Sequence, residues 1–255
     1  MNSKITNWHG QRVWVIGASS GIGEETARTL LARGAILALS ARNVAGLQQI
    51  AKGYAESLVL PLDITNHADV IAAHKQILAL WGSIDLVLIV AGTYNKMRAG
   101  NFDLSVAKQL VEINLNGTLN CLDAVLPALL KQGRGGIGIV SSVAGFRGLP
   151  EALIYGPSKA ALINLCEALY LDLHPRGINV YLINPGFVAT PLTAQNDFAM
   201  PALISAAEAA NQLIRGIERG EFHIHFPRRF TNWLRFMRLL PYRWYFWLVH
   251  KVTGL

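Results

Sequence analysis

Short apolar runs alternate with longer segments of helical periodicity along most of the chain. Runs such as DLVLIVAG and GIGIVSS contain few polar residues, which is typical of parallel strands buried on both faces of a sheet. The alternation predicts right-handed crossovers and an α/β fold, with a doubly wound parallel sheet of about seven strands and helices on both faces. The predicted strands span residues 12–16, 36–41, 57–62, 86–91, 137–141, 179–183 and 222–226. The predicted helices span residues 22–33, 44–53, 68–81, 105–131, 160–174 and 206–219.

This pattern continues to residue 226 without an internal repeat, a low-complexity segment or a linker. We therefore expect one domain over residues 1–226, followed by a C-terminal extension over residues 227–255. Apolar residues make up 52% of the 255 positions and charged residues only 15%. A chain of this length and composition can bury a large core, which excludes the class of disordered proteins.

Several features of the sequence bear on the cell compartment. No stretch is long and apolar enough to predict a membrane-spanning helix, and the N-terminal segment MNSKITNWHGQRVWV lacks the apolar centre of a signal peptide. The two cysteines, Cys121 and Cys166, lie in apolar helical patterns without a second ligand at metal spacing. We read them as buried, reduced thiols and expect a cytoplasmic protein that holds no metal.

The net charge of +7 is concentrated at the C-terminal end of the chain. Residues 226–255 contain no acidic residue, whereas the remaining positions carry 17 Lys and Arg against 16 Asp and Glu. A nearly neutral body argues against a broad nucleic-acid interface and indicates a local role for the basic end. The basic residues of this end are Arg228, Arg229, Arg235, Arg238, Arg243 and Lys251.

A glycine-rich turn connects the first predicted strand to the first predicted helix. Its sequence, GASSGIG, has glycines at positions 17, 21 and 23. Glycines let backbone N–H groups approach an anion, and a helix N-terminus carries partial positive charge. The turn is therefore either a pyrophosphate cradle or a simple tight turn between strand and helix.

The ends of the second and third predicted strands bear on the choice of nucleotide. The second ends in Ala41 and Arg42 without a carboxylate, which favours NADP over NAD because an arginine accommodates a 2′-phosphate. The alternative is an ordinary surface arginine. Asp63 follows the third strand and either caps the next helix or faces an adenine ring.

A tyrosine and a lysine suited to proton transfer stand four positions apart in YGPSK. On a helix, Tyr155 and Lys159 share one face, and Pro157 places the start of that helix near Tyr155. A nearby cation lowers the pKa of a phenol, so Tyr155 is a candidate general acid and base. Ser142 follows the fifth strand, at the edge where open α/β sheets bind ligands. Each residue alone has an ordinary explanation, but their conjunction with the glycine turn favours an active site.

These motifs, in this order, resemble the short-chain dehydrogenase/reductase family, in its single-domain branch of about 250 residues. The resemblance spans roughly residues 10–226 and implies a Rossmann fold with a built-in catalytic site. It implies that Tyr155 exchanges a proton with the substrate oxygen and that Ser142 hydrogen-bonds this oxygen. It also implies that Lys159 holds the nicotinamide ribose and that Asn114 supports a proton relay. The implied catalytic residues are Ser142, Tyr155, Lys159 and Asn114. The implied NADP-binding residues are Gly17, Ser19, Ser20, Gly21, Ile22, Gly23, Arg42, Asp63, Ala91, Gly92, Tyr155, Lys159, Pro185, Gly186, Val188 and Thr190.

Two positions depart from the pattern of the family. Ile16 stands where the family usually has Thr, and Val90 stands where it usually has Asn. Replacing two polar partners together by apolar residues leaves neither unsatisfied. We therefore expect an apolar contact between Ile16 and Val90.

The C-terminal extension combines basic and aromatic residues. Nine of the chain's 22 aromatic residues lie in residues 226–255, and Pro241 predicts a division into two short amphipathic helices. Such a segment could contact an anionic membrane, pack on another subunit or cover the substrate cleft. We expect residues 186–203, which are mostly apolar, to form a substrate lid. His223 and His225 lack a third metal ligand and are interpreted as surface or interface histidines.

Together these features predict an NADP-dependent oxidoreductase that acts on a carbonyl or secondary alcohol of a lipophilic substrate. The resemblance also implies a homodimer or homotetramer. The first alternative is a non-catalytic nucleotide-binding sensor or membrane-surface scaffold, although Ser142, Tyr155 and Lys159 are all present. The second is an epimerase or dehydratase, which the single domain argues against.

Overall fold

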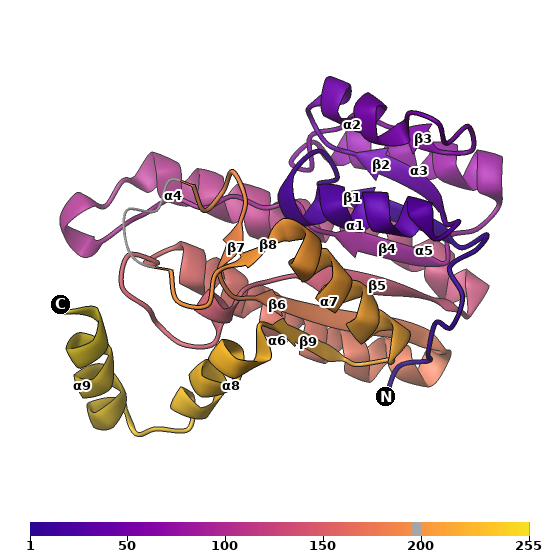
Figure 1. Ribbon diagram of the computed structural model, residues 1–255. Helices are drawn as coiled ribbons and strands as arrows, with labels where there is room; N and C mark the ends of the chain where they lie inside the picture. Colours follow the sequence, from indigo (N-terminus) through magenta and orange to yellow (C-terminus); the bar gives the residue numbers. More distant parts are fainter. Residues whose placement is uncertain (195–199, 255) are drawn as a thin grey trace.

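A seven-stranded parallel sheet forms the centre of the protein (Figure 1). The computed structural model describes residues 1–194 and 200–254. The strand order is β3-β2-β1-β4-β5-β6-β9, which reverses direction between β1 and β4, so the sheet is doubly wound as predicted. The strands are β1 (Arg12–Ile16), β2 (Ile36–Ser40), β3 (Leu58–Val59), β4 (Leu86–Ile89), β5 (Gly135–Val140), β6 (Ile178–Pro185) and β9 (His223–Phe226). The strands β7 (Val188–Ala189) and β8 (Ile204–Ser205) form a separate parallel pair.

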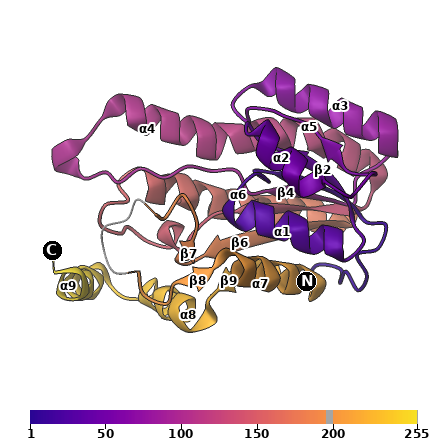
Figure 2. The same ribbon diagram turned by 45° about the horizontal axis from the view of Figure 1, so that its top comes forward.

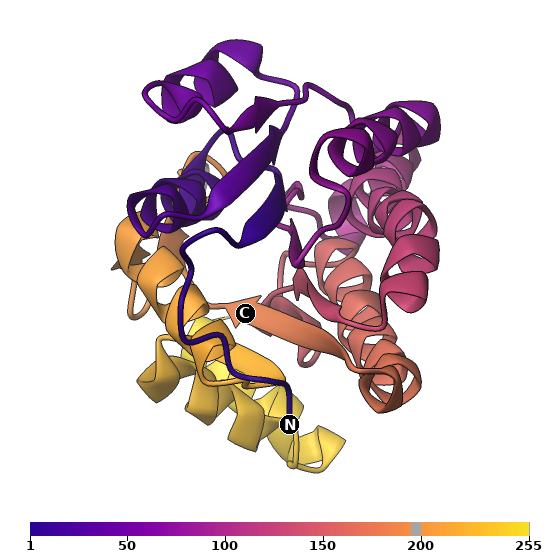
Figure 3. The same ribbon diagram turned by 90° about the vertical axis from the view of Figure 1, so that its right-hand side faces the viewer.

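Helices cover both faces of the sheet (Figure 3). One face carries α1 (Gly21–Ala32), α2 (Val44–Ala51) and α7 (Ala206–Glu218). The other face carries α3 (His67–Trp81), α5 (Gly117–Gln132) and α6 (Tyr155–Leu173). The α/β fold class expected from the alternating pattern is therefore confirmed.

Two apolar cores form because the inner strands of the sheet are buried on both faces. Along β1, Trp14 and Ile16 join one core whereas Val13 and Val15 join the other, as the twofold period of a strand requires. The same period explains why the strands appear in the sequence as continuous apolar runs. Cys121 and Cys166 lie free and fully buried in the first core, where burial raises the pKa of each thiol to about 12.

The long helix predicted over residues 105–131 contains an irregularity that its periodicity did not predict. It consists of α4 (Leu104–Val111), a π-helical turn (Glu112–Asn116) and α5. Such turns widen a helix locally and are frequent at functional sites. Asn114 lies in this turn and is completely buried.

Helix α6 begins at Tyr155, which confirms the start inferred from Pro157. Several strands differ from their predicted bounds. Strand β3 is shorter than expected, although Leu60 N–H still donates to the Leu39 carbonyl 3.0 Å away. Strand β6 is longer and extends to Pro185, so the Pro185–Gly186 turn begins directly at the carboxyl edge of the sheet.

Two short helices follow β9, as Pro241 predicted: α8 (Arg228–Met237) and α9 (Tyr242–Thr253). Figures 1 and 2 show α8 leaving the end of β9 and α9 at the outer end of the molecule. In the described part of the chain, no helix has both the length and the apolar character that crossing a membrane requires.

Candidate functional site

A cleft of about 630 Å³ lies at the carboxyl edge of the sheet, above the point where the strand order reverses. Open α/β sheets bind ligands at this position because the loops diverge there. All sixteen residues predicted to bind NADP line the cleft. Three of the four predicted catalytic residues, Ser142, Tyr155 and Lys159, also line it, and Asn114 lies directly behind.

The glycine turn brings the N-terminus of α1 into the cleft. Gly17 and Gly21 have φ angles of 93° and 56°, a region that favours glycine. A Cβ at Gly17 would lie 2.5 Å from the Ala91 nitrogen, and a Cβ at Gly23 would collide with the Gly17 carbonyl oxygen. The N-cap residue Ser20 makes no capping hydrogen bond with its side chain, so the first-turn N–H groups of α1 face the cleft. This geometry fits a phosphate group.

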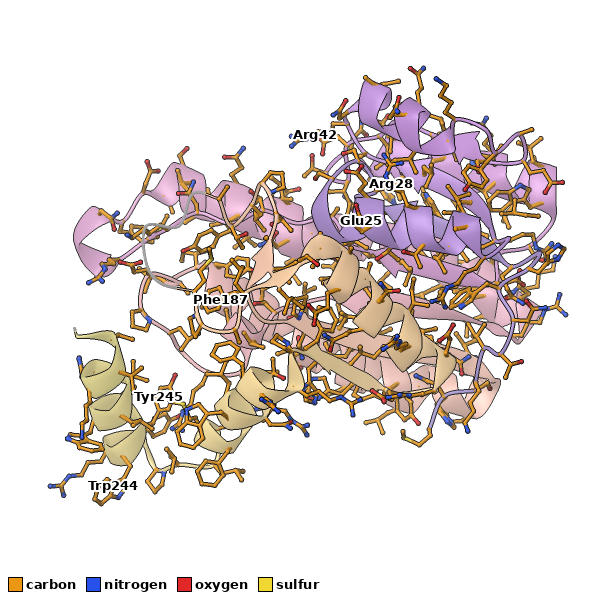
Figure 4. All side chains as sticks on the ribbon, viewed as in Figure 1. Glu25, Arg28, Arg42, Phe187, Trp244 and Tyr245 are labelled. Atoms are coloured by element: carbon orange, nitrogen blue, oxygen red, sulfur yellow. The ribbon has the colours of Figure 1, made fainter. Side chains whose placement is uncertain are left out.

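Arg42 and Asp63 lie at the same end of the cleft. Arg42 is exposed and projects beyond the end of β2 (Figure 4). Asp63 does not cap α3, because Asn66 accepts the hydrogen bonds from the first-turn N–H groups of that helix. Asp63 Oδ1 instead accepts hydrogen bonds from Thr65 N and Oγ1, at 2.9 and 2.8 Å. These bonds hold the pKa of Asp63 below its usual value, and Arg42 adds to the effect.

Tyr155 lies between Ser142 and Tyr94. The rings of Tyr94 and Tyr155 meet edge to face with centroids 5.0 Å apart. Burial raises the pKa of Tyr155 to about 12, while a hydrogen bond with the Ser142 side chain acts in the opposite direction. The expectation of a lowered Tyr155 pKa is therefore wrong for the protein without a bound cofactor. Loss of solvation raises this pKa by more than the Ser142 hydrogen bond lowers it.

Lys159 is almost fully buried below the cleft, with an exposed fraction of 4%. Its Nζ donates to the Val140 carbonyl oxygen at 3.0 Å and lies 5.8 Å from the centroid of the Tyr155 ring. Burial lowers the pKa of Lys159 to about 8. The ammonium group thus titrates near neutral pH beside the candidate proton donor.

The Asn114 side chain is held by three hydrogen bonds. Its Oδ1 accepts from Thr93 N at 2.7 Å, and its Nδ2 donates to Thr93 O at 3.0 Å and to Ser158 Oγ at 3.1 Å. A Cβ on Gly92 would lie 3.2 Å from Lys159 Nζ and 3.3 Å from Asn114 Oδ1. The π-helical turn therefore places Asn114 next to Lys159, and glycine leaves room between them.

The prediction of an apolar contact between the side chains of Ile16 and Val90 is wrong. Their backbones are joined, because Val90 N–H donates to the Ile16 carbonyl oxygen at 2.8 Å. Their side chains pack into cores on opposite faces of the sheet, since Val90 is one position beyond the partner of Ile16 in the ladder. The main chain alone therefore joins the two strands at these positions.

The interpretation of His223 and His225 as surface or interface histidines is wrong for His225, and His223 is half-buried against its neighbours. His225 is buried: its Nδ1 lies 2.7 Å from Thr231 Oγ1, and its Nε2 lies 2.9 Å from the Arg235 guanidinium. His223 Nε2 lies 2.9 Å from Asn184 Nδ2, and its ring meets Phe146 edge to face. The two histidines join β9 to β6 and α8. The sequence pattern of a short strand did not reveal these contacts, because the partners lie in α8, in β6 and in the loop after β5.

The two histidines, each with a lowered pKa, predict a loss of stability in acid. Burial, with help from Arg235 and Arg228, lowers the pKa of His225 to about 4. Between pH 4 and 6.5 the unfolded chain binds more protons, so the free energy of unfolding falls as the pH falls through this window. We expect His225→Asn to reduce this fall by about 3 kcal/mol, since one pKa unit corresponds to about 1.4 kcal/mol. Urea unfolding at both pH values measures it, and an unchanged pH dependence would contradict the assignment. His9→Asn, at an exposed position, is the control.

Several cleft residues were not identified from the sequence. Tyr94 and Thr93 follow the Ala91-Gly92 pair in an irregular segment, where periodicity carries no signal. Ser141 binds the Lys159 carbonyl oxygen through its hydroxyl at 2.7 Å, and only its place beside Ser142 hinted at a role. Of the predicted lid over 186–203, residues 195–199 lie outside the described residues. Pro191, Leu192 and Thr193 line the cleft.

Comparison with known proteins agrees with this arrangement. Residues 11–200 match the family model described as short chain dehydrogenase. An uncharacterized oxidoreductase of Myxococcus xanthus is 34% identical over 232 residues, which cover 89% of this chain and 91% of the relative. A short chain dehydrogenase/reductase of Burkholderia phymatum, solved in complex with NAD, superposes with a TM-score of 0.82 at 22% identity, covering 91% of this chain and 94% of the other. A structure named ribose-5-phosphate isomerase, from Brucella melitensis, has a TM-score of 0.76 at 28% identity and covers 85% and 90%.

The family match extends over most of the chain, and the Myxococcus relative is similar over nearly its full length. The fold, the cleft at the reversal of strand order and the glycine turn are consistent with that match. The chain therefore belongs to the short-chain dehydrogenase/reductase family, whose members bind NAD(P), and is an oxidoreductase of that family.

Proposed function

We propose that the protein transfers a hydride between NADP(H) and the carbonyl or secondary alcohol group of a lipophilic substrate. The observation that carries this proposal is the meeting of Ser142, Tyr155 and Lys159 in the cleft that also contains the N-terminus of α1. A phosphate-binding turn and a proton donor within one cleft are the two parts that such a reaction requires.

The residues of the chain bind, orient and exchange the proton. When bound, the nicotinamide cofactor supplies the hydride acceptor or donor. In reduction, the Tyr155 hydroxyl gives its proton to the carbonyl oxygen, and in oxidation the phenolate removes the proton of the alcohol. Ser142 donates a hydrogen bond to the same oxygen and keeps it next to Tyr155. Lys159 Nζ lies 5.8 Å from the centre of the Tyr155 ring, where it would hold the nicotinamide ribose, and Asn114 supports the relay that returns the proton.

The cleft fits NADP in three respects. The glycines at positions 17 and 23 let the turn pack closely against the Ala91 backbone and against itself, which leaves the α1 N-terminus at the cleft for a pyrophosphate. Arg42 is exposed at the cleft end where the ribose 2′ position lies in dinucleotide folds. No carboxylate follows β2 at that point to repel a 2′-phosphate.

The remaining parts of the proposal concern the substrate and the assembly. Pro191 and Leu192 add apolar side chains to the lining of the cleft, which favours a lipophilic substrate. Residues 1–226 form the nucleotide-binding and catalytic domain, and residues 227–255 form an extension. The protein is a homodimer or homotetramer. It is located in the cytoplasm, where its free cysteines stay reduced. Its extension lies near the inner face of the membrane.

An isomerase is the competing function that a comparison suggests, since the Brucella structure carries such a name. An isomerase of sugar phosphates transfers no net electrons to a nucleotide. The family match and the Myxococcus oxidoreductase favour the redox reaction. Consumption of NADPH with an added ketone separates the two functions, because an isomerase leaves NADPH unchanged.

A fluorescence titration with NADPH and NADH tests the cofactor proposal. We expect NADPH to bind at least about tenfold more tightly, because an arginine–phosphate contact contributes about 1.5–3 kcal/mol. Arg42→Ala weakens NADPH binding by this factor and leaves NADH binding within about threefold. The control is Arg134→Ala, at an exposed position on the amino edge of the sheet. Equal binding of both nucleotides to the wild type contradicts the assignment of Arg42.

A further inference from the structure

Helices α8 and α9 are attached to the loop that carries Ser142. The Arg147 guanidinium donates hydrogen bonds to the carbonyl oxygens of Met237 at 2.9 Å and Leu240 at 2.6 Å, at the C-terminus of α8. It also lies over the rings of Tyr242 and Tyr245, at 4.7 and 4.1 Å from their centroids. A cation at a helix C-terminus is favourable, and stacking on two rings adds to it. Arg147 therefore fixes both helices to the segment between Ser142 and Tyr155.

A second attachment joins α8 to the Pro185–Gly186 turn. Gly186 N–H donates to the Phe226 carbonyl oxygen at 2.7 Å, and the rings of Phe187 and Phe230 lie 5.7 Å apart. A Cβ at Gly186 would lie 3.1 Å from Phe230 Cδ1. Helix α8 is thus packed against a loop that lines the cleft, and its position relative to the cleft is defined.

The outward side of these helices is apolar and aromatic. Six of the eight exposed aromatic residues in the described part of the chain lie in α8 and α9, with Leu239, 80% exposed, between the helices. Figure 4 shows Tyr245 directed toward the body and Trp244 directed away from it. An exposed apolar cluster of this kind marks an interaction surface, and Trp and Tyr suit a membrane–water boundary. The six residues are Trp233, Phe236, Tyr242, Trp244, Phe246 and Trp247.

All Lys, Arg, Asp and Glu side chains of the α8–α9 region are positively charged ones. Residues 226–255 contain six Lys and Arg residues and no Asp or Glu, while the rest of the chain is nearly neutral. Arg229, Arg243 and Lys251 are exposed among the aromatic residues. An anionic bilayer complements both features at once, because its headgroups attract the cations and its acyl region receives the aromatic rings.

We infer that α8 and α9 form a docking surface for an anionic lipid bilayer. Docking places the Ser142 loop and the Pro185–Gly186 turn beside the membrane, since α8 and α9 are attached to both. A substrate dissolved in the bilayer then has a short route to the cleft. Only this last statement rests on the proposed function, because lipid binding is independent of catalysis.

Co-sedimentation of the full-length protein with vesicles tests the inference. We expect binding to vesicles that contain phosphatidylglycerol, weaker binding in high salt and little binding to pure phosphatidylcholine. Replacing Arg229, Arg243 and Lys251 together by Gln lowers the partition coefficient on the order of a hundredfold, at about fivefold per basic residue near the surface. The matched control replaces Lys131, Arg134 and Arg176 by Gln, at exposed positions on the amino edge of the sheet.

The outcomes separate the inference from its rivals and from the proposed function. The inference is overturned if the wild type stays in the supernatant at low salt, or if the control variant loses as much binding as the α8–α9 variant. It is also overturned if light scattering shows that the α8–α9 variant dissociates an oligomer while neither form binds lipid, since the surface is then a contact between copies. Loss of ketone reduction with intact lipid binding instead overturns only the proposed function.

Discussion

Replacing Tyr155 by Phe lowers kcat by about 10²- to 10⁴-fold, the usual contribution of a general acid or base. Phenylalanine keeps the ring and its edge-to-face contact with Tyr94, so the surroundings of the cleft remain filled. The change removes only the hydroxyl that hydrogen-bonds Ser142 and exchanges the proton. Steady-state measurement of NADPH consumption with a lipophilic ketone gives the effect.

Two further measurements make this result specific to the proton transfer. NADPH binding to Tyr155→Phe stays within about threefold of the wild type, since the hydroxyl contributes little to ground-state binding. Tyr170→Phe, on the same helix but packed against Phe222, leaves kcat unchanged. A Tyr155→Phe variant that keeps full activity would remove Tyr155 from the mechanism.

Replacing Lys159 by Met abolishes most of the activity and at the same time stabilises the fold. Burial lowers the pKa of Lys159 to about 8 from its ordinary value of 10.5. At pH 7 the lysine is charged in both states, so the folded protein bears the whole cost of burying that charge. At about 1.4 kcal/mol per pKa unit, we expect the free energy of unfolding to rise by about 3 kcal/mol at pH 7. An active site that lowers the stability of the fold by burying a charge is a common compromise between stability and activity.

The pH dependence distinguishes this origin from simple repacking. Between pH 8 and about 9 the lowered pKa of Lys159 makes the unfolded wild-type chain bind more protons than the folded chain, so wild-type stability rises with pH in this window. The window closes near pH 9, because the raised pKa values of Cys121 and Cys166 oppose the trend above their ordinary value of 9, and the raised pKa of Tyr155 adds to this from pH 10. In Lys159→Met the rise disappears, which urea unfolding at several pH values measures. Lys108→Met, at an exposed position, changes stability by less than about 0.5 kcal/mol, and a wild type without the rise contradicts the assignment.

The sequence predicted the elements whose signals are local. Continuous apolar runs identified the buried strands, and Pro157 and Pro241 located helix ends correctly. The positions that line the cleft followed from motifs placed after strands, because all carboxyl ends of a parallel sheet lie at one edge. The π-helical turn that places Asn114 behind Lys159 had no such signal. Such a turn displaces the apolar stripe by about one residue, and the pattern over 105–131 was read as one continuous helix.

What the sequence determined by itself is the alternation of strands and helices, the family and the residues that meet at the carboxyl edge. The tertiary structure decided the electrostatic character of those residues and the place of the C-terminal helices. The raised pKa of Tyr155 and the lowered pKa of Lys159 come from burial, which depends on distant segments. Two contacts likewise join segments that only folding brings together. They are the contact of His225 with Arg235 and the hydrogen bond from Arg147 to the Leu240 carbonyl oxygen. The same packing leaves the six aromatic residues of α8 and α9 more than half exposed.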